Sequence, residues 1–147
     1  MQQKTASAAR KLMPAEFFLD TNILLYAASG AVNEKEKRAI ARELLTREGG
    51  SMSVQVLAEF YVNATAKLKL PEDKVARILE SLENYPIQPI SEAVFWSAIA
   101  IKKRYQMSYW DSAIIAAAIE LGCKTVYSED LNNGQVYAGV RVINPFA

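Results

Sequence analysis

The chain has 147 residues, of which 51% are hydrophobic and 22% charged, a composition typical of one globular domain and unlike that of a disordered protein. Its 17 basic and 16 acidic residues give a net charge of +1, so no global basic field marks it as a nucleic-acid binder. Histidine is absent and Cys123 is the only cysteine, which excludes Ser–His and Cys–His catalysis, internal disulfides and cysteine-rich zinc sites.

Residues 1–14 are expected to form an N-terminal extension, followed by a single domain over residues 15–147. The extension carries basic residues but lacks the apolar stretch of a secretory signal, so we expect it to be disordered or helical. No apolar run is long enough to cross a membrane, and a lone cysteine fits a reducing compartment. These features predict a cytoplasmic protein.

The first half of the chain alternates short apolar runs with segments of helical periodicity. In chain order, the expected elements are the strand Glu16–Leu19, the helices Ile23–Ala27 and Asn33–Glu48, the strand Ser51–Ser53 and the helix Val54–Leu68. The charged helix Asn33–Glu48 has Ala39, Ile40 and Leu44 on its apolar side, so we expect that side to be buried. Gly49 and Gly50 end it.

The second half continues the alternation. Pro71 opens a helix at a position where its missing N–H costs nothing. The remaining expected elements are the strand Ile87–Ile90, a helix opened by Ser91, the helix Ser108–Leu121, and the strands Thr125–Tyr127 and Val140–Ile143. Pro89 places the strand Ile87–Ile90 at a sheet edge, because proline cannot donate a ladder hydrogen bond.

Strands separated by helices predict an α/β fold with a mostly parallel sheet that is covered by helices on both faces. In such sheets, ligands bind beyond the carboxyl ends of the strands. The residues directly after each strand are therefore candidates for a functional site.

Two acidic positions follow predicted strands. Asp20 comes directly after the run Phe17–Leu19, where an aspartate either caps the next helix or ligates a metal. Glu129 and Asp130 follow the strand Thr125–Tyr127 in a polar turn, and a turn alone does not need two adjacent carboxylates. The pattern leaves open which of these two faces a site.

Two further acidic residues lie on predicted helices. Glu59 has Gln55 and Asn63 at i−4 and i+4, which makes a polar strip on an otherwise apolar helix. Asp111 has apolar residues at i+3, i+4 and i+7, so we expect it to share the buried face of its helix. Ser108 and Asp111 also fit a capping box, with aspartate in place of the usual glutamate.

Carboxylates that gather at one edge of a sheet repel one another unless a cation neutralises them. Hard oxygen ligands without histidine or thiolate favour Mg²⁺ or Mn²⁺. These ions suit the hydrolysis of phosphodiesters, because they polarise the phosphate and activate the attacking water. Phosphate contacts are expected from exposed basic residues, and the candidates are Lys67, Lys69, Lys102, Lys103 and Arg104.

Four segments together resemble the PIN-domain family, and its VapC-type toxins in particular. They are FFLDTNILLY with Asp20, VQVLAEFY with Glu59, SYWDSAIIAAAIELGC with Asp111 and VYSEDLNNG with Asp130. The resemblance runs from about Glu16 to Pro145. It implies a three-layer α/β/α sandwich around a mostly parallel five-stranded sheet.

The resemblance also implies an activity: a Mg²⁺- or Mn²⁺-dependent endoribonuclease, the toxin of a type II toxin–antitoxin pair. Its metal-binding and catalytic residues are implied to be Asp20, Glu59, Asp111 and Asp130, with Glu129 as a further metal-binding residue and with Asn22 and Ser128 as supporting hydrogen-bonding residues. The implied partners are substrate RNA, a second copy of the chain in a homodimer, and a cognate antitoxin. Asn33–Glu48 and Val54–Leu68 are the candidate walls of the groove that takes the antitoxin's helix.

Two other functions fit parts of the sequence. A PIN scaffold without activity would bind RNA or protein and cut nothing. A phosphoacceptor receiver domain also combines a parallel α/β fold with Mg²⁺. Receivers, however, need an acidic pair near the first strand, an aspartate after the third and a lysine after the fifth. Here the strand Ile87–Ile90 ends without aspartate and the sequence SED stands where the lysine belongs.

Overall fold

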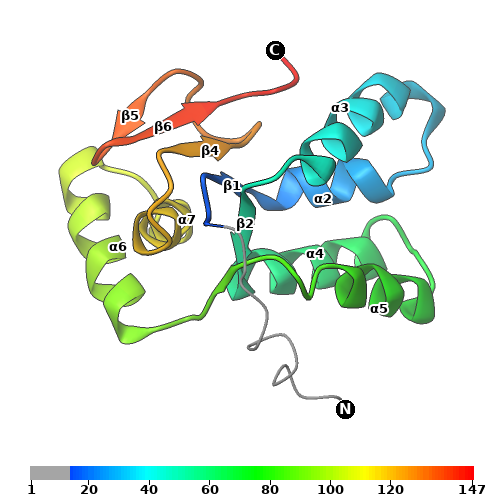
Figure 1. Cartoon of the computed structure of the whole chain (residues 1–147), viewed down its shortest axis with the longest axis horizontal. Coiled ribbons are helices and arrows are strands. Elements are labelled where there is room, and N and C mark those ends of the chain that lie inside the picture. The colour runs from blue at the N-terminus through cyan, green and yellow to red at the C-terminus, as the bar shows by residue number, and fades with distance from the viewer. Residues whose placement is uncertain (1–13) are drawn as a thin grey trace.

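The computed structural model describes residues 14–147 and shows a three-layer α/β/α fold (Figure 1). The predicted N-terminal extension, except for Pro14, lies outside these residues. In the part that is described, no helix is long and apolar enough to span a bilayer.

The middle layer is a six-stranded sheet in the order β3-β2-β1-β4-β6-β5. Its strands are β1 (Phe17–Leu19), β2 (Gly50–Ser53), β3 (Ile87–Gln88), β4 (Thr125–Tyr127), β5 (Val136–Tyr137) and β6 (Val140–Ile143). Neighbouring strands are parallel except for the antiparallel pair β5 and β6. The mostly parallel sheet is therefore confirmed, and β3 lies at its edge as Pro89 predicts.

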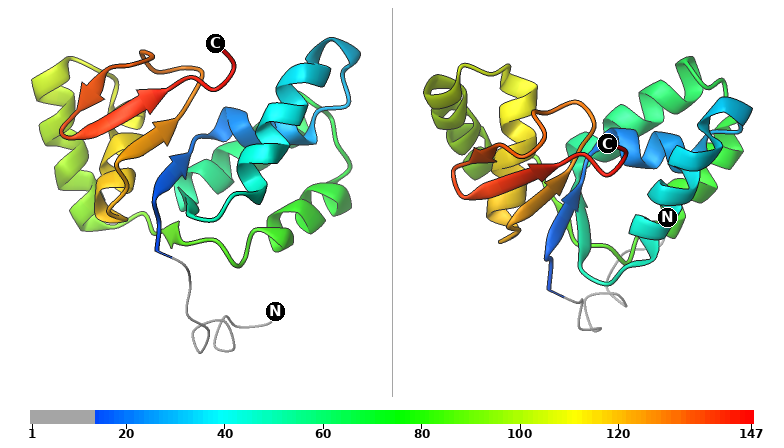
Figure 2. Two further views of the ribbon diagram at one scale, coloured as in Figure 1. Left: turned by 45° about the horizontal axis from the view of Figure 1, so that its top comes forward. Right: turned by 90° about the horizontal axis from the view of Figure 1, so that it is seen from above.

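Helices flank the sheet on both sides (Figure 2). They are α2 (Thr21–Ala28), α3 (Lys35–Thr46), α4 (Val54–Ala66), α5 (Glu72–Ser81), α6 (Glu92–Tyr105) and α7 (Tyr109–Glu120), with a 3-10 turn at Val32–Glu34. The helices α6 and α7 pack together on one side, and α2 lies between α3 and α4 on the other. Three of these helices begin at serine caps, since Ser53, Ser91 and Ser108 each accept a hydrogen bond from the backbone N–H three residues later.

The core centres on β1 and α7. Phe18 and Leu19 have no exposed surface, and every residue from Ser112 to Ala118 is buried. Four of those seven residues are alanines, which let neighbouring elements approach the helix closely on all sides. This arrangement places the first residue beyond β1 and the first turn of α7 at the same end of the sheet.

The sixth strand was not expected from the sequence, which predicted five. β5 has only two residues, and a tight turn at Ala138 and Gly139 joins it to β6. Both turn residues have positive φ angles, 50° for Ala138 and 88° for Gly139. Glycine adopts this conformation readily, whereas alanine does so rarely. The pair Ala–Gly therefore gives a weak hairpin signal, and the strand is too short to show periodicity.

The buried side of α3 also differs from the prediction. Ala41 and Leu44 are buried, whereas Ala39 and Ile40 are exposed, so only one of the three predicted residues is correct. The inward side instead includes Lys37, whose ammonium group lies over the Tyr26 ring at 4.8 Å from its centroid. Because a lysine can pack its apolar stem against other side chains while its charged group stays in water, the inward side of a helix need not consist of apolar residues alone.

Candidate functional site

Four predicted carboxylates line one pocket at the carboxyl end of the sheet. The pocket has a volume of about 240 Å³, and the four are Asp20, Glu59, Asp111 and Asp130. β1 and β4 are adjacent and parallel, so Asp20 after β1 and Asp130 after β4 emerge at the same edge. α4 and α7 bring in the other two. The predicted convergence of these four residues in space is therefore found in the structure.

Asp20 is the most enclosed of the four carboxylates, with 7% of its surface exposed. It is the N-cap of α2: its Oδ1 accepts a hydrogen bond of 2.7 Å from the backbone N–H of Thr21. Its Oδ2 accepts one of 2.7 Å from the hydroxyl of Ser128. The helix cap is therefore confirmed, and the same side chain lines the pocket, where metal binding by Asp20 stays a prediction.

Burial raises the pKa of the Asp20 carboxyl from 3.8 to about 6. The hydrogen bonds from Ser128 and Thr21 oppose this shift, and the negative charges of Asp130 and Glu59 add to it. Asp130 and Glu59 therefore both lie near enough to Asp20 to disfavour its charged form. A divalent cation in the pocket would remove this penalty on the charged form.

The polar strip on α4 faces the pocket. Gln55, Glu59 and Asn63 recur every four residues, and Lys67 continues the row; all four line the pocket. Glu59 is held by the hydroxyl of Thr21, which donates to its Oε1 at 2.8 Å. Spacing on the helix therefore predicted this side of the site correctly, although the contact from Thr21 was missed.

Asp111 lies in the first turn of α7 and is exposed, so the prediction that it shares a buried face is wrong. Over the next two turns the helix is buried around its whole circumference. Asp111 lies just before that buried stretch, at the end of the helix that borders the pocket. Ser108 caps the helix by accepting from the backbone N–H of Asp111 at 3.1 Å, which is the serine half of the expected capping box. The partial positive charge of the helix N-terminus favours a carboxylate at this position.

The turn after β4 separates two consecutive carboxylates. Asn22 donates to Oδ2 of Asp130 at 3.2 Å, beside the pocket, and accepts from the backbone N–H of Glu129 at 3.3 Å. The Glu129 side chain does not line the pocket; it is bound by Tyr26 and Lys37 instead. Asn22 and Ser128 thus have the supporting position that was expected, and Asp130 is the member of the pair that faces the pocket.

The donor set fits a hard divalent cation, since it offers carboxylate oxygens with amide and hydroxyl groups around them. Within residues 14–147, however, no three acidic or other ligand side chains lie close enough together to hold one ion as they stand. Binding one ion with several of these carboxylates would therefore require their side chains to move closer together.

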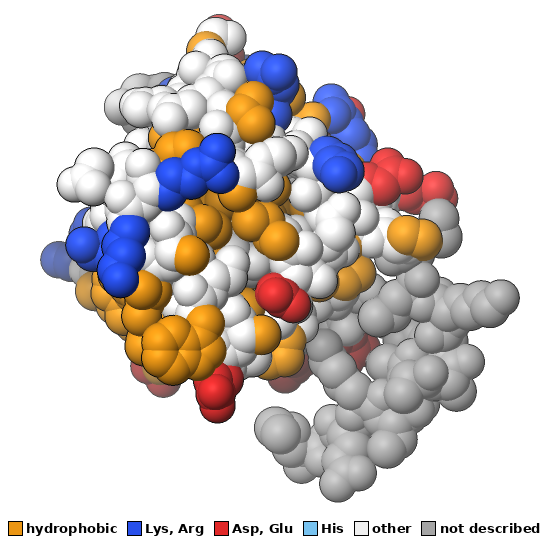
Figure 3. All heavy atoms as spheres, turned by 90° about the vertical axis from the view of Figure 1, so that its left-hand side faces the viewer, with side chains coloured by type: hydrophobic (Ala, Val, Ile, Leu, Met, Phe, Trp, Pro, Cys, Tyr) orange, Lys and Arg blue, Asp and Glu red, His pale blue; other side chains and the backbone are white. Residues whose placement is uncertain are grey.

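Of the five basic residues proposed for phosphate contacts, Lys67 alone lines this pocket. Lys102, Lys103 and Arg104 lie in the last turn of α6 and are exposed. On the α6 side of the molecule, Lys and Arg side chains alternate with hydrophobic ones at the surface (Figure 3). Lys67 is therefore the strongest candidate for a contact with a phosphate bound among the carboxylates.

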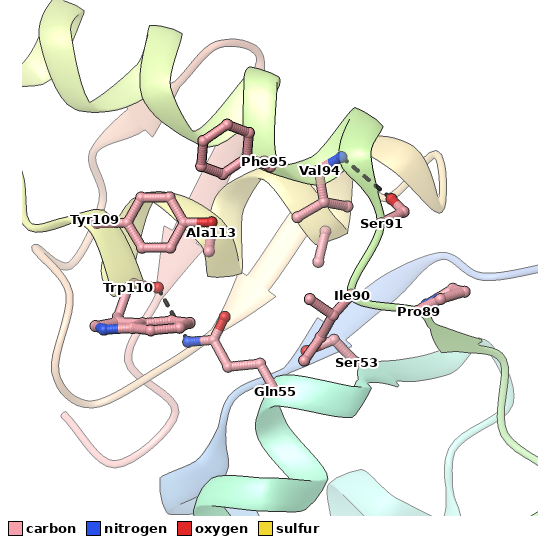
Figure 4. A pocket seen from close by; sticks show the side chains of 11 residues that line it. Ser53, Gln55, Pro89, Ile90, Ser91, Val94, Phe95, Tyr109, Trp110 and Ala113 are labelled. Carbon is pink, nitrogen blue, oxygen red and sulfur yellow. Dashed lines mark hydrogen bonds between the residues drawn. The ribbon is translucent and has the colours of Figure 1, made fainter.

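A row of aromatic rings lies next to the acidic pocket. Tyr109 and Trp110 have ring centroids 4.9 Å apart, and Phe95 lies 6.1 Å from Tyr109. Gln55 lines both this region and the acidic pocket, and its side-chain amide donates to the backbone carbonyl of Trp110 at 3.1 Å (Figure 4). Trp110 is 60% exposed and directly precedes Asp111. Apolar surface therefore borders the carboxylates.

The raised pKa of Asp20 predicts a pH-dependent stability. Between pH 3.8 and about 6, the folded protein holds a proton that the unfolded chain has lost. The free energy of unfolding therefore falls as the pH rises through this window, by up to about 3 kcal/mol. Urea denaturation of the metal-free protein measures it, with Asp20→Asn as the reference because amide side chains do not titrate here.

The difference in stability between wild type and Asp20→Asn isolates this group from all others that titrate. As the pH rises to about 7, Asp20→Asn should become more stable relative to wild type. A constant difference across the window would show that Asp20 has an ordinary pKa. Ser128→Ala removes a hydrogen bond that lowers the pKa of Asp20. In this variant the fall in the free energy of unfolding should therefore extend to higher pH than in wild type.

Comparison with known proteins gives a family match. The model of the PIN domain matches residues 17–138. Among curated proteins, none matches the sequence.

Several solved structures share the fold. The chain is similar to VapC20 of Mycobacterium tuberculosis, described as a sarcin-ricin loop cleaving toxin, with a TM-score of 0.65, 15% identity and coverage of 86% of this chain and 99% of that one. It is also similar to a chain of a toxin–antitoxin complex from Klebsiella pneumoniae, with a TM-score of 0.62, 22% identity and coverage of 89% and 98%. A third, from DNA-bound VapBC of Salmonella typhimurium, has a TM-score of 0.63, 19% identity and coverage of 87% and 96%. At these identities the likeness shows the fold.

Proposed function

Because the chain belongs to the PIN domain family, we propose that it is a Mg²⁺- or Mn²⁺-dependent endoribonuclease, the toxin of a type II toxin–antitoxin pair. The observation that carries the proposal is the pocket of about 240 Å³ lined by Asp20, Glu59, Asp111 and Asp130. Membership of this family also argues against the receiver-domain alternative. The VapC and toxin–antitoxin neighbours in fold support the toxin role.

The four carboxylates would hold the cation. When bound, a divalent ion supplies polarisation of the phosphodiester and activation of water. Thr21 orients Glu59, and Ser128 orients Asp20 through one carboxylate oxygen each. Side chains held in place by hydrogen bonds cost less reorganisation when the substrate binds, which is how a site of this kind lowers the barrier.

Lys67 would contribute a positive charge for the substrate. It lies at the end of the polar strip on α4, in the same pocket as the carboxylates. An RNA backbone approaching four carboxylates meets repulsion that the cation offsets only in part, so a lysine at the rim favours a bound phosphate. The overall charge of +1 gives no other general attraction for RNA.

Two protein partners are proposed. A cognate antitoxin would restrain the nuclease by laying a helix along the surface near α3 and α4, with an Arg or Lys reaching the carboxylates. A second copy of the chain would cover exposed apolar side chains, which include Ile90, Trp96 and Trp110 with 68%, 60% and 60% of their surface exposed. Light scattering on the purified chain tests the homodimer, and a monomer at micromolar concentration would exclude it. A proposed RNA substrate and a proposed antitoxin both support a cytoplasmic location, which belongs to the same proposal.

RNA cleavage by the purified protein, with and without Mn²⁺, tests the function. We expect cleavage only when the ion is present. Bound metal should also raise the free energy of unfolding by about 2.7 kcal/mol at one hundred times the dissociation constant. For a chain of this size that is an increase in melting temperature of roughly 5–10 °C.

Asp20→Asn is the control for the melting experiment, because it deletes one carboxylate from the pocket. Its melting temperature should hardly respond to Mn²⁺. An equal rise in both proteins would indicate non-specific ion effects and count against a defined site. RNA binding by the wild type without cleavage in any metal would support the remaining alternative, a PIN scaffold that is catalytically silent.

A further inference from the structure

Glu129 and Asp130 are neighbours in the chain, yet their side chains diverge. Asp130 lines the acidic pocket, whereas Glu129 is bound at a second place between α2 and α3. There its Oε1 accepts from the hydroxyl of Tyr26 at 2.5 Å, and its Oε2 accepts from Lys37 at 2.5 Å. Both carboxylate oxygens are therefore occupied outside the pocket.

Lys37 and Tyr26 are themselves fixed by aromatic packing. The Lys37 ammonium donates to the Tyr26 hydroxyl at 3.1 Å and lies 4.8 Å from the centroid of the Tyr26 ring. The ring of Phe146 packs edge-on against Tyr26 at 4.9 Å and lies 5.6 Å from the same ammonium. We call Lys37, Tyr26 and Glu129 the clasp. It joins the consecutive helices α2 and α3 to the turn after β4, and Glu129 lies 92 positions beyond Lys37 in the sequence.

The backbone at Glu129 lies beside the pocket wall. Its N–H donates to Asn22, a residue that lines the pocket and also donates to Asp130. The backbone N–H groups of Asp130 and Leu131 both point to the hydroxyl of Ser128, which fixes the turn. With the turn fixed, the clasp decides where the Glu129 carboxylate lies.

The clasp contributes little to the stability of the fold. Lys37 and Glu129 have 39% and 26% of their side-chain surface exposed, and ion pairs this exposed to solvent contribute little to folding. The clasp would matter more for the pocket, because a fifth carboxylate in the pocket would add both a negative charge and a further metal ligand. Metal affinity and the repulsion of RNA would both change.

We propose that Lys37 and Tyr26 are positioning residues that hold Glu129 outside the acidic pocket and so limit its metal-binding set to four carboxylates. This inference rests on the proposed function, because it concerns the metal site. It assigns Asp130 as the ligand from the turn and gives Glu129 a structural partner instead.

Titration calorimetry with Mn²⁺ on four proteins tests the proposal: wild type, Glu129→Gln, Lys37→Met and the double variant. Methionine keeps most of the apolar stem of Lys37 against the two rings and deletes the charge. In wild type the Glu129→Gln change should leave Mn²⁺ affinity within about twofold. Lys37→Met should tighten binding by at least about threefold because Glu129 is freed, and adding Glu129→Gln should reverse that gain.

Two further variants separate the clasp from charge alone. Lys35→Met removes the same charge from the first turn of the same helix, at an exposed position, and should leave the affinity within about twofold. Tyr26→Phe keeps the ring against Phe146 and loses only the hydroxyl that binds Glu129, so it should shift affinity in the direction of Lys37→Met. Urea denaturation confirms that each variant is folded.

A loss of affinity of about tenfold in Glu129→Gln alone would overturn the inference, because Glu129 would then be a ligand. Equal affinities of Lys37→Met and Lys35→Met would overturn it as well. If wild type binds no Mn²⁺, the proposed function fails and the inference fails with it. If wild type binds Mn²⁺ but the effects of Lys37→Met and Glu129→Gln on affinity are independent, the inference is wrong and the proposed function still holds.

Discussion

Asp111→Asn should lose RNA cleavage by about 100-fold or more while remaining folded. Removing a group that only orients a metal ligand typically lowers activity or metal affinity by about 10- to 100-fold, so removing a ligand itself should lower activity at least as much. Asn keeps the volume of the side chain and deletes one negative charge from the pocket. Asp20→Asn and Glu59→Gln should behave in the same way. Cleavage of a labelled RNA in Mn²⁺ measures the loss.

The chain offers a matched control for this experiment. Asp73 lies in the first turn of α5, as Asp111 does in α7, and is also exposed. Asp73→Asn therefore loses the same favourable interaction with a helix N-terminus, about 0.3–1 kcal/mol, at a position outside the pocket. It should keep full activity. Full activity of a purified Asp111→Asn protein would falsify the assignment of this residue to the site.

The stability of these variants is part of the prediction. The metal-free pocket contains carboxylates that repel one another, and Asp20 is penalised by burial. Asp20→Asn should accordingly be as stable as wild type or more stable at pH 7 without metal. A variant that is inactive because it has unfolded supports nothing, and urea denaturation distinguishes the two cases.

Expression of the wild-type chain in a host that lacks its partner should slow or stop growth. A ribonuclease without its inhibitor degrades RNA that the cell needs, so the effect depends on the same carboxylates as cleavage. Cells that express Asp111→Asn at the same protein level should grow normally, whereas Asp73→Asn should slow growth as much as wild type does. Colony counts and growth rates after induction measure this result.

Co-expression with the product of an adjacent small gene should restore growth and yield a complex that co-purifies. The restoring protein should lose its effect when its Arg or Lys nearest the carboxylates is replaced, because that contact competes with metal and RNA. If the wild-type chain is harmless at high level and no neighbouring product binds it, the toxin role is wrong. That outcome would still be consistent with a PIN nuclease that has another task in the cell.

Much of the fold follows from the sequence because its signals are local. The strand before Asp20, the serine caps and the glycine after α7 all mark element boundaries through short-range chemistry. Local patterns also singled out Asp20 after its strand, Glu59 on its polar strip, Asp111 on its helix and the pair Glu129 and Asp130, whereas the choice of Asp130 from that pair came only from the family resemblance. Position relative to the ends of a parallel sheet is a property that a sequence shows.

The parts that the sequence did not predict depend on tertiary contacts. Asp111 was expected to be buried because its helix has apolar neighbours on one side, but α7 is buried on all sides and its first turn is open. Thr21 donates to Glu59 across 38 positions of sequence, and Lys37 reaches Glu129 across 92. Such contacts exist only after distant segments have packed, and no local pattern indicates them.

The order of the strands has a consequence for translation. β1 lies in the middle of the sheet, and the hydrogen bond between Asp20 and Ser128 joins residues 108 positions apart. The pocket therefore cannot form until the ribosome has released β4 and the turn that follows it. A nascent chain that has not yet reached β4 contains Asp20, Glu59 and Asp111 without the turn that carries Asp130. Any catalytic activity of the pocket thus begins only after the turn from Ser128 to Asp130 has been synthesised and has joined the sheet.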